Sequence, residues 1–323
     1  MKAIMLKELA NHFGSVRFMI LLAVVFMVAL LGVFLAGQGV RDVLGQGGAT
    51  YLEGRAFLTL FTAPGALMSL LAFMSLFGPM VGLVLGFDAV NRERNQGTLS
   101  KILSQPIYRD EVILGKYLAG LVTVSILFTA LGLMLVGLGL MGVGLVPTAD
   151  EVLRLLAFLV LSIVYVGFWL ALAMLLSIVF RSVATSALAA AALWILMSFF
   201  VPVFGQAAAG ALVPLDDPQN PRADELAAFD RVSRVIALAS PPSLFSEAST
   251  MLLDPTHRGS QQALRISTMS RLDQFLLNRF QGVLSINQSL VLVTPDLLAL
   301  LAFHLGVFLL SYLAFVRQEV RSA

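Results

Sequence analysis

The residues with the clearest chemical potential lie in one short charged segment, Asp88–Lys116. It carries five of the 21 Lys and Arg residues of the chain and lies between two long apolar stretches. Glu93 and Arg94 can form ion pairs, while Leu99 and Leu103 are apolar residues in an otherwise polar loop. A few apolar anchors with polar groups around them are typical of a surface that docks another protein. From the pattern alone, an ordinary solvated loop is an equally good interpretation.

The sequence lacks the groups from which most active sites are built. It has no cysteine, so disulfides, thiol catalysis and Cys-ligated metals are excluded. No carboxylate pair, HExxH helix or nucleophile–base arrangement suggests an intramembrane hydrolase. The histidines His12, His257 and His304 fall in three different compartments of the topology predicted below, so no metal site is expected within one subunit. We expect the chain to bind no cofactor and no metal and to have no catalytic residue.

The composition places the chain in a membrane. Hydrophobic residues make up 59% of its 323 residues and charged residues only 12%, with a mean hydropathy of +0.91. Soluble domains carry about 25% charged residues. We therefore predict a single all-α transmembrane domain over residues 1–323, embedded in the lipid bilayer. Nucleic-acid binding would need a clustered basic face, and none large enough is present.

Six apolar segments are long enough to cross a bilayer, which needs about 20 residues of helix. The predicted spans are Phe18–Ala36, Pro64–Phe87, Tyr117–Val146, Leu155–Phe180, Ser182–Phe204 and Leu297–Val316. The first has no small-residue cleavage site suited to a signal peptide, so it is interpreted as a retained span. Each span must be helical because lipid offers no partners for exposed backbone groups. His304 is the one histidine within the spans, and we expect it to be a hydrogen-bonded packing residue.

The distribution of basic residues predicts the orientation. Six spans put both termini on one side, and eleven Lys and Arg residues fall on that side, against three in the short loops of the other. Basic residues in short loops favour the cytoplasmic face. We therefore predict that both termini and the charged segment are cytoplasmic, in the inner or plasma membrane, and that residues 205–291 lie outside.

Short helices are expected on the cytoplasmic side. Residues 1–14 form an amphipathic pattern that predicts a helix in the interface plane. Within the charged segment, Asn91–Ser104 is predicted as one short helix, in which Gly97 allows close approach of a neighbour. Gln105–Pro106 ends this helix. Asp110 is expected to cap a second helix that continues into the third span.

Three glycines recur every four residues in the second span, at Gly78, Gly82 and Gly86. This spacing lines one helix face with hydrogen atoms, so another backbone can approach it closely. Packing inside one subunit is the favoured interpretation, and a seam between two copies is the alternative.

The predicted external segment, residues 205–291, is too long for a structureless loop. Three helices are expected in it: Arg222–Leu238, one that starts with Ser240 as cap and Pro241 at its first position, and Gln261–Phe280. They could form a small lid that gates the protein or docks an extracytoplasmic partner. The favoured alternative is a helical cap that packs on its own spans.

The charged segment also resembles the signature of type-2 ATP-binding-cassette (ABC) permeases. In that family an acidic residue precedes Gly-Thr-Leu, a Pro and an Arg follow, and a Gly-Lys opens the third span. The matching residues are Glu93, Gly97, Thr98, Leu99, Pro106, Arg109, Gly115 and Lys116. The six-span layout and the N-terminal interfacial helix are similar too. Among members, the chain most resembles permeases of nitrous-oxide-reductase maturation and of gliding motility, although Ser100 and the long external segment depart from the common pattern.

The resemblance implies a permease whose charged segment, residues 88–116, holds a coupling helix that docks a separate ATPase. The sequence has no GxxxxGK[ST] loop to cradle phosphates, so ATP and Mg would be bound by the partner subunits. Two ATPases and a second permease copy, as a homodimer, are implied. The residues expected to contact the ATPase are Glu93, Arg94, Gly97, Thr98, Leu99, Leu103, Pro106 and Arg109, with Leu99 and Leu103 as its buried anchors.

Three functions remain open at this point. The first is an exporter of an apolar or amphiphilic substrate. The second is an ATP-driven mechanical transmission that acts on an external partner without moving a solute. The third, outside the ABC class, is a membrane scaffold. The chain itself is not expected to be an enzyme.

Overall fold

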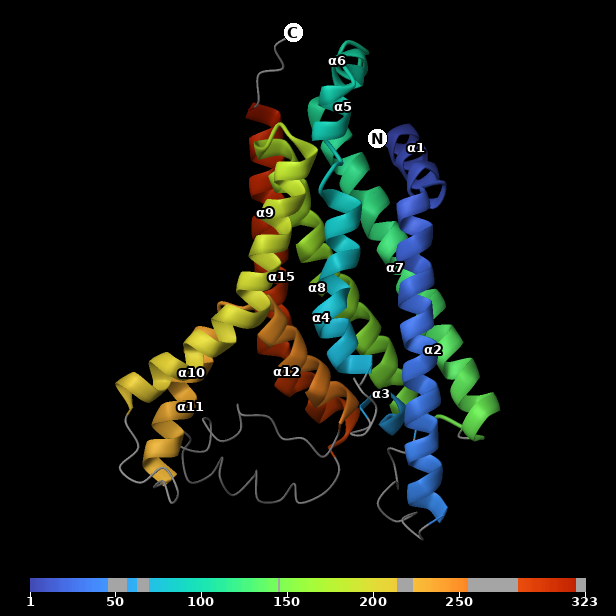
Figure 1. The fold of residues 1–323 in the computed structure, drawn as a ribbon, viewed down its shortest axis with the longest axis vertical. Coiled ribbons are helices and arrows are strands. Elements are labelled where there is room, and N and C mark those ends of the chain that lie inside the picture. Colours follow the sequence, from blue (N-terminus) through green and yellow to red (C-terminus); the bar gives the residue numbers. More distant parts are fainter. Residues whose placement is uncertain (46–56, 63–69, 145, 214–222, 255–283, 318–323) are drawn as a thin grey trace.

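The computed structural model describes residues 1–45, 57–62, 70–144, 146–213, 223–254 and 284–317. These residues form helices and no strand, which confirms the all-α prediction (Figure 1). The first half contains α1 (Lys2–Phe13), α2 (Val16–Gly45), α3 (Thr59–Thr62), α4 (Leu70–Gly86), α5 (Asn91–Asn95), α6 (Thr98–Leu103) and α7 (Arg109–Val143). The second half contains α8 (Ala149–Val179), α9 (Val183–Ile195), a π-helical turn (Leu196–Phe200), α10 (Val201–Leu212), α11 (Ala223–Ala237), α12 (Pro241–Leu253) and α15 (Ile286–Arg317).

Five helical stretches in the described part of the chain are long and apolar enough to cross a membrane, and a bent pair can supply a sixth. That pair is α1 and the first part of α2, which meet at an angle of 63°. The bend lies at Gly14 and Ser15, where α1 was expected to leave the span. We call the end of the bundle that carries α1, α5 and α6 the charged end (Figure 1).

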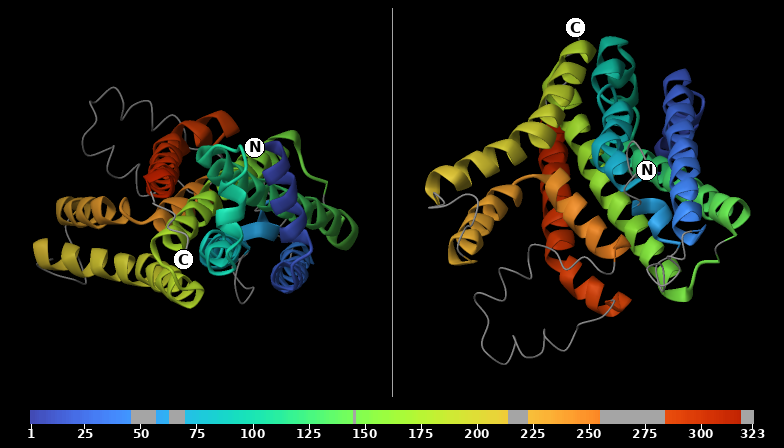
Figure 2. Two further views of the ribbon diagram at one scale, coloured as in Figure 1. Left: turned by 90° about the horizontal axis from the view of Figure 1, so that it is seen from above. Right: turned by 60° about the horizontal axis from the view of Figure 1, so that its bottom comes forward.

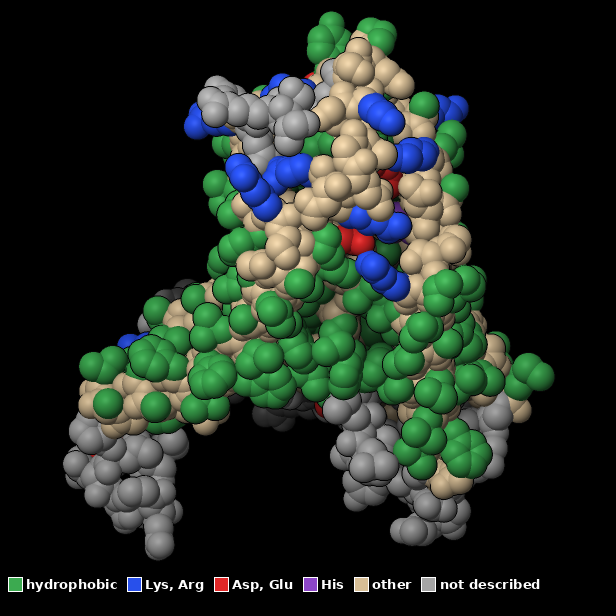
Figure 3. Space-filling model, turned by 45° about the horizontal axis from the view of Figure 1, so that its top comes forward, with side chains coloured by type: hydrophobic (Ala, Val, Ile, Leu, Met, Phe, Trp, Pro, Cys, Tyr) green, Lys and Arg blue, Asp and Glu red, His purple; other side chains and the backbone are tan. Residues whose placement is uncertain are grey.

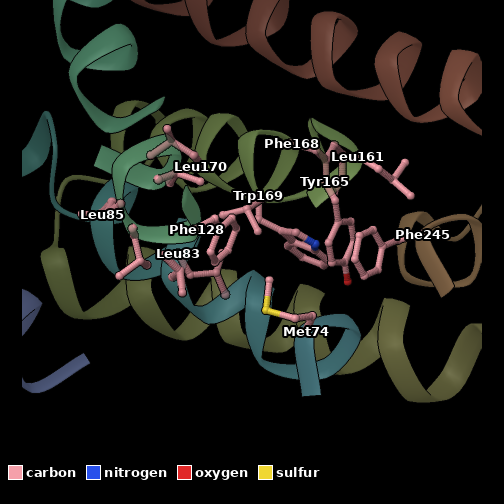
Figure 4. Packing of buried hydrophobic residues seen from close by; sticks show 14 of the residues in the cluster. Met74, Leu83, Leu85, Phe128, Leu161, Tyr165, Phe168, Trp169, Leu170 and Phe245 are labelled. Carbon is pink, nitrogen blue, oxygen red and sulfur yellow. The ribbon is translucent and has the colours of Figure 1, made fainter. Parts of the chain in front are cut away.

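Helix α8 is the centre of the bundle, because α4, α7, α9, α12 and α15 all pack against it. Large aromatic side chains fill this core (Figure 4). Tyr165 and Trp169 of α8 are fully buried, and the Tyr165 ring stacks on Phe245 of α12 with centroids 4.2 Å apart. Burial of such rings contributes most of the favourable packing in a core.

The glycines of the second span lie in the contact between α4 and α8. A Cβ added at Gly82 would lie 2.6 Å from the carbonyl oxygen of Val166, and one at Gly86 would lie 2.7 Å from the Cβ of Ala173. Gly78 is less tight, with its nearest neighbour at 3.4 Å. This glycine face is therefore occupied by a helix of the same subunit, as the packing interpretation expected, rather than by a second copy.

A proline inside α4 adds a second tie to α8. Pro79 has no N–H, so the carbonyl of Ser75, four residues earlier, loses its helical donor. The hydroxyl of Tyr165 donates to this oxygen at 2.7 Å. The indole N–H of Trp194 on α9 donates to the next carbonyl, that of Leu76, at 3.1 Å. The hydroxyl of Tyr165 thus satisfies the backbone carbonyl that Pro79 leaves without a helical donor.

The fifth span does not end at Phe204, as the sequence predicted. The helix continues through the π-helical turn Leu196–Phe200 and then as far as Leu212. The chain next returns to this turn, because the hydroxyl of Ser240 donates to the carbonyl of Met197 at 3.0 Å. Ser240 belongs to the predicted external segment, residues 205–291, yet it contacts the middle of the fifth span.

Two of the three helices predicted in residues 205–291 are present. Helix α11 matches the predicted Arg222–Leu238 within a residue at each end. Helix α12 has Ser240 as its cap, which accepts from the N–H of Ser243, and Pro241 at its first position. Figure 2 shows α10 and α11 side by side, projecting from the bundle, whereas α12 packs on α4, α8 and α15. The predicted helix Gln261–Phe280 lies outside the described residues.

A buried arginine joins three helices at the end opposite the charged end. Arg154 of α8 is 0% exposed, and its Nε donates to Asp150 at 2.6 Å. Its other nitrogens donate to the hydroxyl of Ser289 on α15 and to the carbonyls of Leu252 and Leu284. The predicted fourth span began at Leu155, whereas α8 begins six residues earlier.

His304 is a packing residue, as expected. Its Nε2 is hydrogen-bonded to the hydroxyl of Tyr117, and its Nδ1 lies 3.1 Å from the carbonyl oxygen of Val164. Gly167 leaves room for the ring, because a Cβ there would lie 2.5 Å from the His304 Cε1. These contacts join α7, α8 and α15 in the interior.

Candidate docking site

The charged segment forms a compact projection beyond the membrane-spanning helices (Figure 1). We call residues 91–109, which comprise α5, α6 and the turn into α7, the knob. The sequence predicted one helix here, but the chain breaks it at Gly97, whose φ of +67° suits glycine. The hydroxyl of Thr98 donates to the carbonyl of Glu93 across the break at 3.2 Å. Two short helices thus meet at a defined corner.

The second helix of this region also begins differently from the prediction. Tyr108, with extended backbone, is the N-cap of α7, and Asp110 lies in the first turn rather than at the cap. Asp110 and Glu111 place negative charge near the helix N-terminus, where the backbone N–H groups favour it.

The base of the knob is fastened to α8. The hydroxyl oxygen of Ser177 accepts from the backbone N–H groups of Val90 and Asn91, at 3.0 and 3.1 Å. Arg94 donates to the carbonyl of Ile178 at 3.3 Å. Val90, Asn91 and Ser177 are fully buried. The position of the knob is therefore set by the end of the central helix.

Four alternating charges connect the knob to α1 and α7. We call Lys7, Glu8, Glu93 and Lys116 the charge cluster. Lys116 lies 3.0 Å from Glu8 Oε1 and 2.9 Å from Glu93 Oε1, and Lys7 lies 3.1 Å from each of these oxygens. The side chain of Lys116 is only 5% exposed. Each cation thus bridges two carboxylates. These ion pairs offset the free-energy cost of removing the charges from water.

This cluster changes the role expected for Glu93. The sequence placed Glu93 at the surface that contacts the ATPase. Its side chain is 13% exposed and its Oε1 bonds to two lysines of the same chain. Glu93 therefore holds the knob against α1 and α7. In the sequence, the charged pair Lys7-Glu8 of α1 and Lys116 near the start of α7 could have indicated this role.

One of the two predicted anchors differs from expectation, and the other is not tested. Leu99 is 1% exposed and belongs to the core of its own subunit, so it is not available to insert into a partner. Leu103 lies in α6, and its side chain is outside the described set. Exposed instead is Tyr108, which leaves 77% of its surface accessible at the corner between α6 and α7. Sequence reasoning missed it, although it stands between Pro106 and Arg109 of the motif.

Among the side chains of the knob that the structure describes, Tyr108 and Pro106 are the exposed residues without a polar or glycine character. The exposed residues of the knob are Arg92, Asn95, Gln96, Gly97, Ser100, Lys101, Ser104, Gln105, Pro106, Tyr108 and Arg109. Of the residues predicted to contact the ATPase, Gly97, Pro106 and Arg109 are exposed, and Arg94 and Thr98 are half-buried. Among the described residues, no three acidic or His side chains are grouped in a way that could hold a metal ion. An exposed aromatic side chain within a polar surface is typical of a surface that binds a protein.

The charge cluster predicts a pH dependence of stability. Burial would raise the pKa of Glu8, but the attraction of Lys116 and Lys7 outweighs it and lowers this pKa below its usual value. A lowered carboxyl pKa contributes stability above the unfolded value of about 4.3, which is lost as the pH falls through the folded value. We expect Glu8→Gln to lower the melting temperature at pH 7 and to have no effect at low pH, measured by thermal unfolding in detergent. A difference that is independent of pH would contradict this.

Comparison with known proteins identifies a family whose members resemble this chain in sequence. The profile of a family described as "ABC-2 family transporter protein" matches residues 2–320. The chain is 33% identical over 112 residues to the "Probable ABC transporter permease protein NosY" of Pseudomonas aeruginosa, which is 35% of each chain. It is 27% identical over 112 residues to the protein of the same description from Stutzerimonas stutzeri, which is 34% of this chain and 35% of that one. The match thus spans about a third of the length of these relatives.

Proposed function

Since this chain belongs to the ABC-2 transporter family, we propose that it is the permease subunit through which separate ATPase subunits drive the export of an apolar or amphiphilic substrate. It is an integral membrane protein with five to six candidate spans. The charged end faces the cytoplasm, where the ATPases are. ATP and Mg belong to those partners, and the working unit contains two ATPases and a second copy of this chain.

The observation that carries this proposal is the knob. It projects beyond the spans, it is fixed to α8 through Ser177, and it exposes Tyr108 at its corner. Tyr and Arg are the residues that most often dominate a protein interface, and Tyr108 and Arg109 stand side by side. A rigid projection with an exposed aromatic ring is suited to transmit force from a bound ATPase.

The first test removes the exposed ring. Tyr108→Ala is expected to weaken binding of a co-expressed ABC ATPase by about thirtyfold, since an interface hot spot contributes about 2 kcal/mol. Co-purification and the affinity of the isolated subunits measure this. Leu133→Ala, which truncates an exposed apolar residue of α7 outside the knob, is the matched control and should bind as the wild type does. Unchanged ATPase binding by Tyr108→Ala would disprove docking through this corner.

Mechanical transmission without solute movement is the second candidate. It is supported by the Arg154 contacts, which join α8 to α12 and α15 at the end opposite the knob. Movement of α8 can reach that end without a path for a solute. Flux assays in vesicles that contain the complex separate the two candidates, because ATP hydrolysis without flux of any amphiphilic probe would favour transmission.

A further inference from the structure

A cleft of about 600 Å³ opens beside the knob at the charged end. It lies between α1, the start of α2, the end of α4, α5 and α7, and it holds Lys7, Arg17, Asp88 and Arg92 among its lining residues. Figure 3 shows Lys and Arg side chains around Asp and Glu side chains in this upper part of the molecule, directly above a continuous apolar surface. The cleft is thus at the level where a membrane interface would lie.

The charges of the cleft are arranged in two layers. The carboxylates are inside, because the side chains of Glu8, Asp88 and Glu93 are 12 to 15% exposed. Two of the cations, Arg17 and Arg92, are outside and are 59% and 60% exposed, whereas Lys116 is buried between Glu8 and Glu93. Both arginines approach the same Asp88 oxygen, Oδ2, at 2.8 and 3.9 Å. Since a guanidinium has five N–H donors, each arginine keeps donors that point away from Asp88.

An apolar stripe continues from Arg17 down α2. Ile20, Val24, Met27 and Leu31 follow it at i+3, i+7, i+10 and i+14, so all five residues share one helix face. These apolar side chains are between 44% and 62% exposed. Arg17 could bind the anionic headgroup of a phospholipid, and the apolar stripe below it could contact the acyl chains.

We propose that this cleft binds the phosphate headgroup of an anionic phospholipid from the membrane leaflet at the charged end. Arg17 and Arg92 donate to the phosphate, because guanidinium groups bind phosphate oxygens in a bidentate manner. The acyl chains lie along the α2 stripe. The site is independent of ATPase docking through Tyr108.

Two other occupants fit less well. An ATPase is soluble and cannot cover the stripe, which runs along a membrane-spanning helix. A second copy of the chain would meet mostly like charge, because Arg17 and Arg92 are the more exposed members of their ion pairs with Asp88, and Lys2, Lys101 and Arg109 are exposed at the same end. A ligand that complements both the exposed arginines and the apolar stripe has an anionic group and an apolar tail.

Native mass spectrometry of the purified full-length chain, after exchange into equal amounts of phosphatidylglycerol and phosphatidylcholine, tests the proposal. The wild type should retain phosphatidylglycerol preferentially. The double variant Arg17→Gln with Arg92→Gln should reduce this preference by roughly 25-fold, from about fivefold for each basic residue at a membrane surface. Arg181→Gln is the matched control, because Arg181 is an exposed arginine at the same end but outside the cleft, and it should retain the lipid as the wild type does.

A variant with the opposite expected sign excludes a structural explanation. Asp88→Asn removes the internal competitor of both arginines, so it should increase phosphatidylglycerol retention. A decrease would mean that the ion pair only maintains the fold, and the proposal would be wrong. Three other results would overturn the proposal. The Arg181→Gln control could lose as much phosphatidylglycerol as the double variant, the double variant could retain as much as the wild type, or inorganic phosphate could displace the lipid.

Discussion

Gly82→Leu is expected to prevent α4 from packing on α8. The Cβ alone would lie 2.6 Å from the carbonyl oxygen of Val166 and 2.8 Å from the backbone nitrogen of Leu170, and backbone atoms of a central helix cannot turn aside as a side chain can. Overpacking of this kind costs about 3 kcal/mol or more. We expect a large loss of folded protein, measured as monodisperse yield and as melting temperature in detergent.

The matched control is Gly137→Leu on α7, where an added Cβ has no neighbour within 4 Å. It should fold as the wild type does. Alanine gives a sharper contrast, because Gly137→Ala should stabilise its helix by up to about 1 kcal/mol through helix propensity. Gly82→Ala should instead destabilise the protein. Equal melting temperatures for the two alanine variants would show that the α4–α8 contact is looser than described.

Arg154→Met is expected to destabilise the end of the bundle opposite the knob. The arginine is fully buried and donates to one carboxylate, one hydroxyl and two carbonyls. Methionine has a similar length but no donor, so the buried acceptors lose their partner. Each buried neutral acceptor left without its donor costs about 1–3 kcal/mol, whereas Asp150, whose side chain is 42% exposed, can be solvated. Thermal unfolding should show a fall of the melting temperature comparable with that of Gly82→Leu.

Two comparisons separate charge from geometry at this site. Arg154→Lys keeps the charge but presents a single ammonium group, which cannot reach all of the acceptors that Arg154 binds, so it should recover only part of the loss. Arg181→Met, at an exposed position, should leave the melting temperature unchanged. If Arg154→Met melted as the wild type does, the contacts of Arg154 with α12 and α15 would contribute nothing to stability.

Apolar run lengths and capping residues were sufficient to predict much of the fold. The helical class, α11 and the cap of α12 followed from local pattern, because Ser240 with Pro241 defines a helix start without reference to the rest of the chain. Boundaries that depend on contacts did not follow. The helix continues to Leu212 past Pro202 and Gly205, which locally favour an end near Phe204. The return of Ser240 to Met197 is a contact between residues 43 apart.

The candidate site shows the same limit more strongly. The motif located the knob, but it did not distinguish residues that face a partner from those that hold the knob in place. Leu99 and Glu93 carry the apolar and charged character of anchors, and only the positions of α1, α7 and α8 show that both are used inside the chain. The predicted fourth span starts at Leu155 and so leaves Arg154 outside it, although Thr148 and Glu151 form the capping box that starts α8 before it.

The hydrogen bonds between the base of the knob and Ser177 determine which helices would respond to a force applied to the knob. Ser177 holds the backbone at the end of α4, while Gly82 and Gly86 seat α4 along α8, and Arg154 joins the other end of α8 to α12 and α15. A push on the knob would therefore act first on α8 and, through its contacts, on α12 and α15 at the opposite end of the bundle.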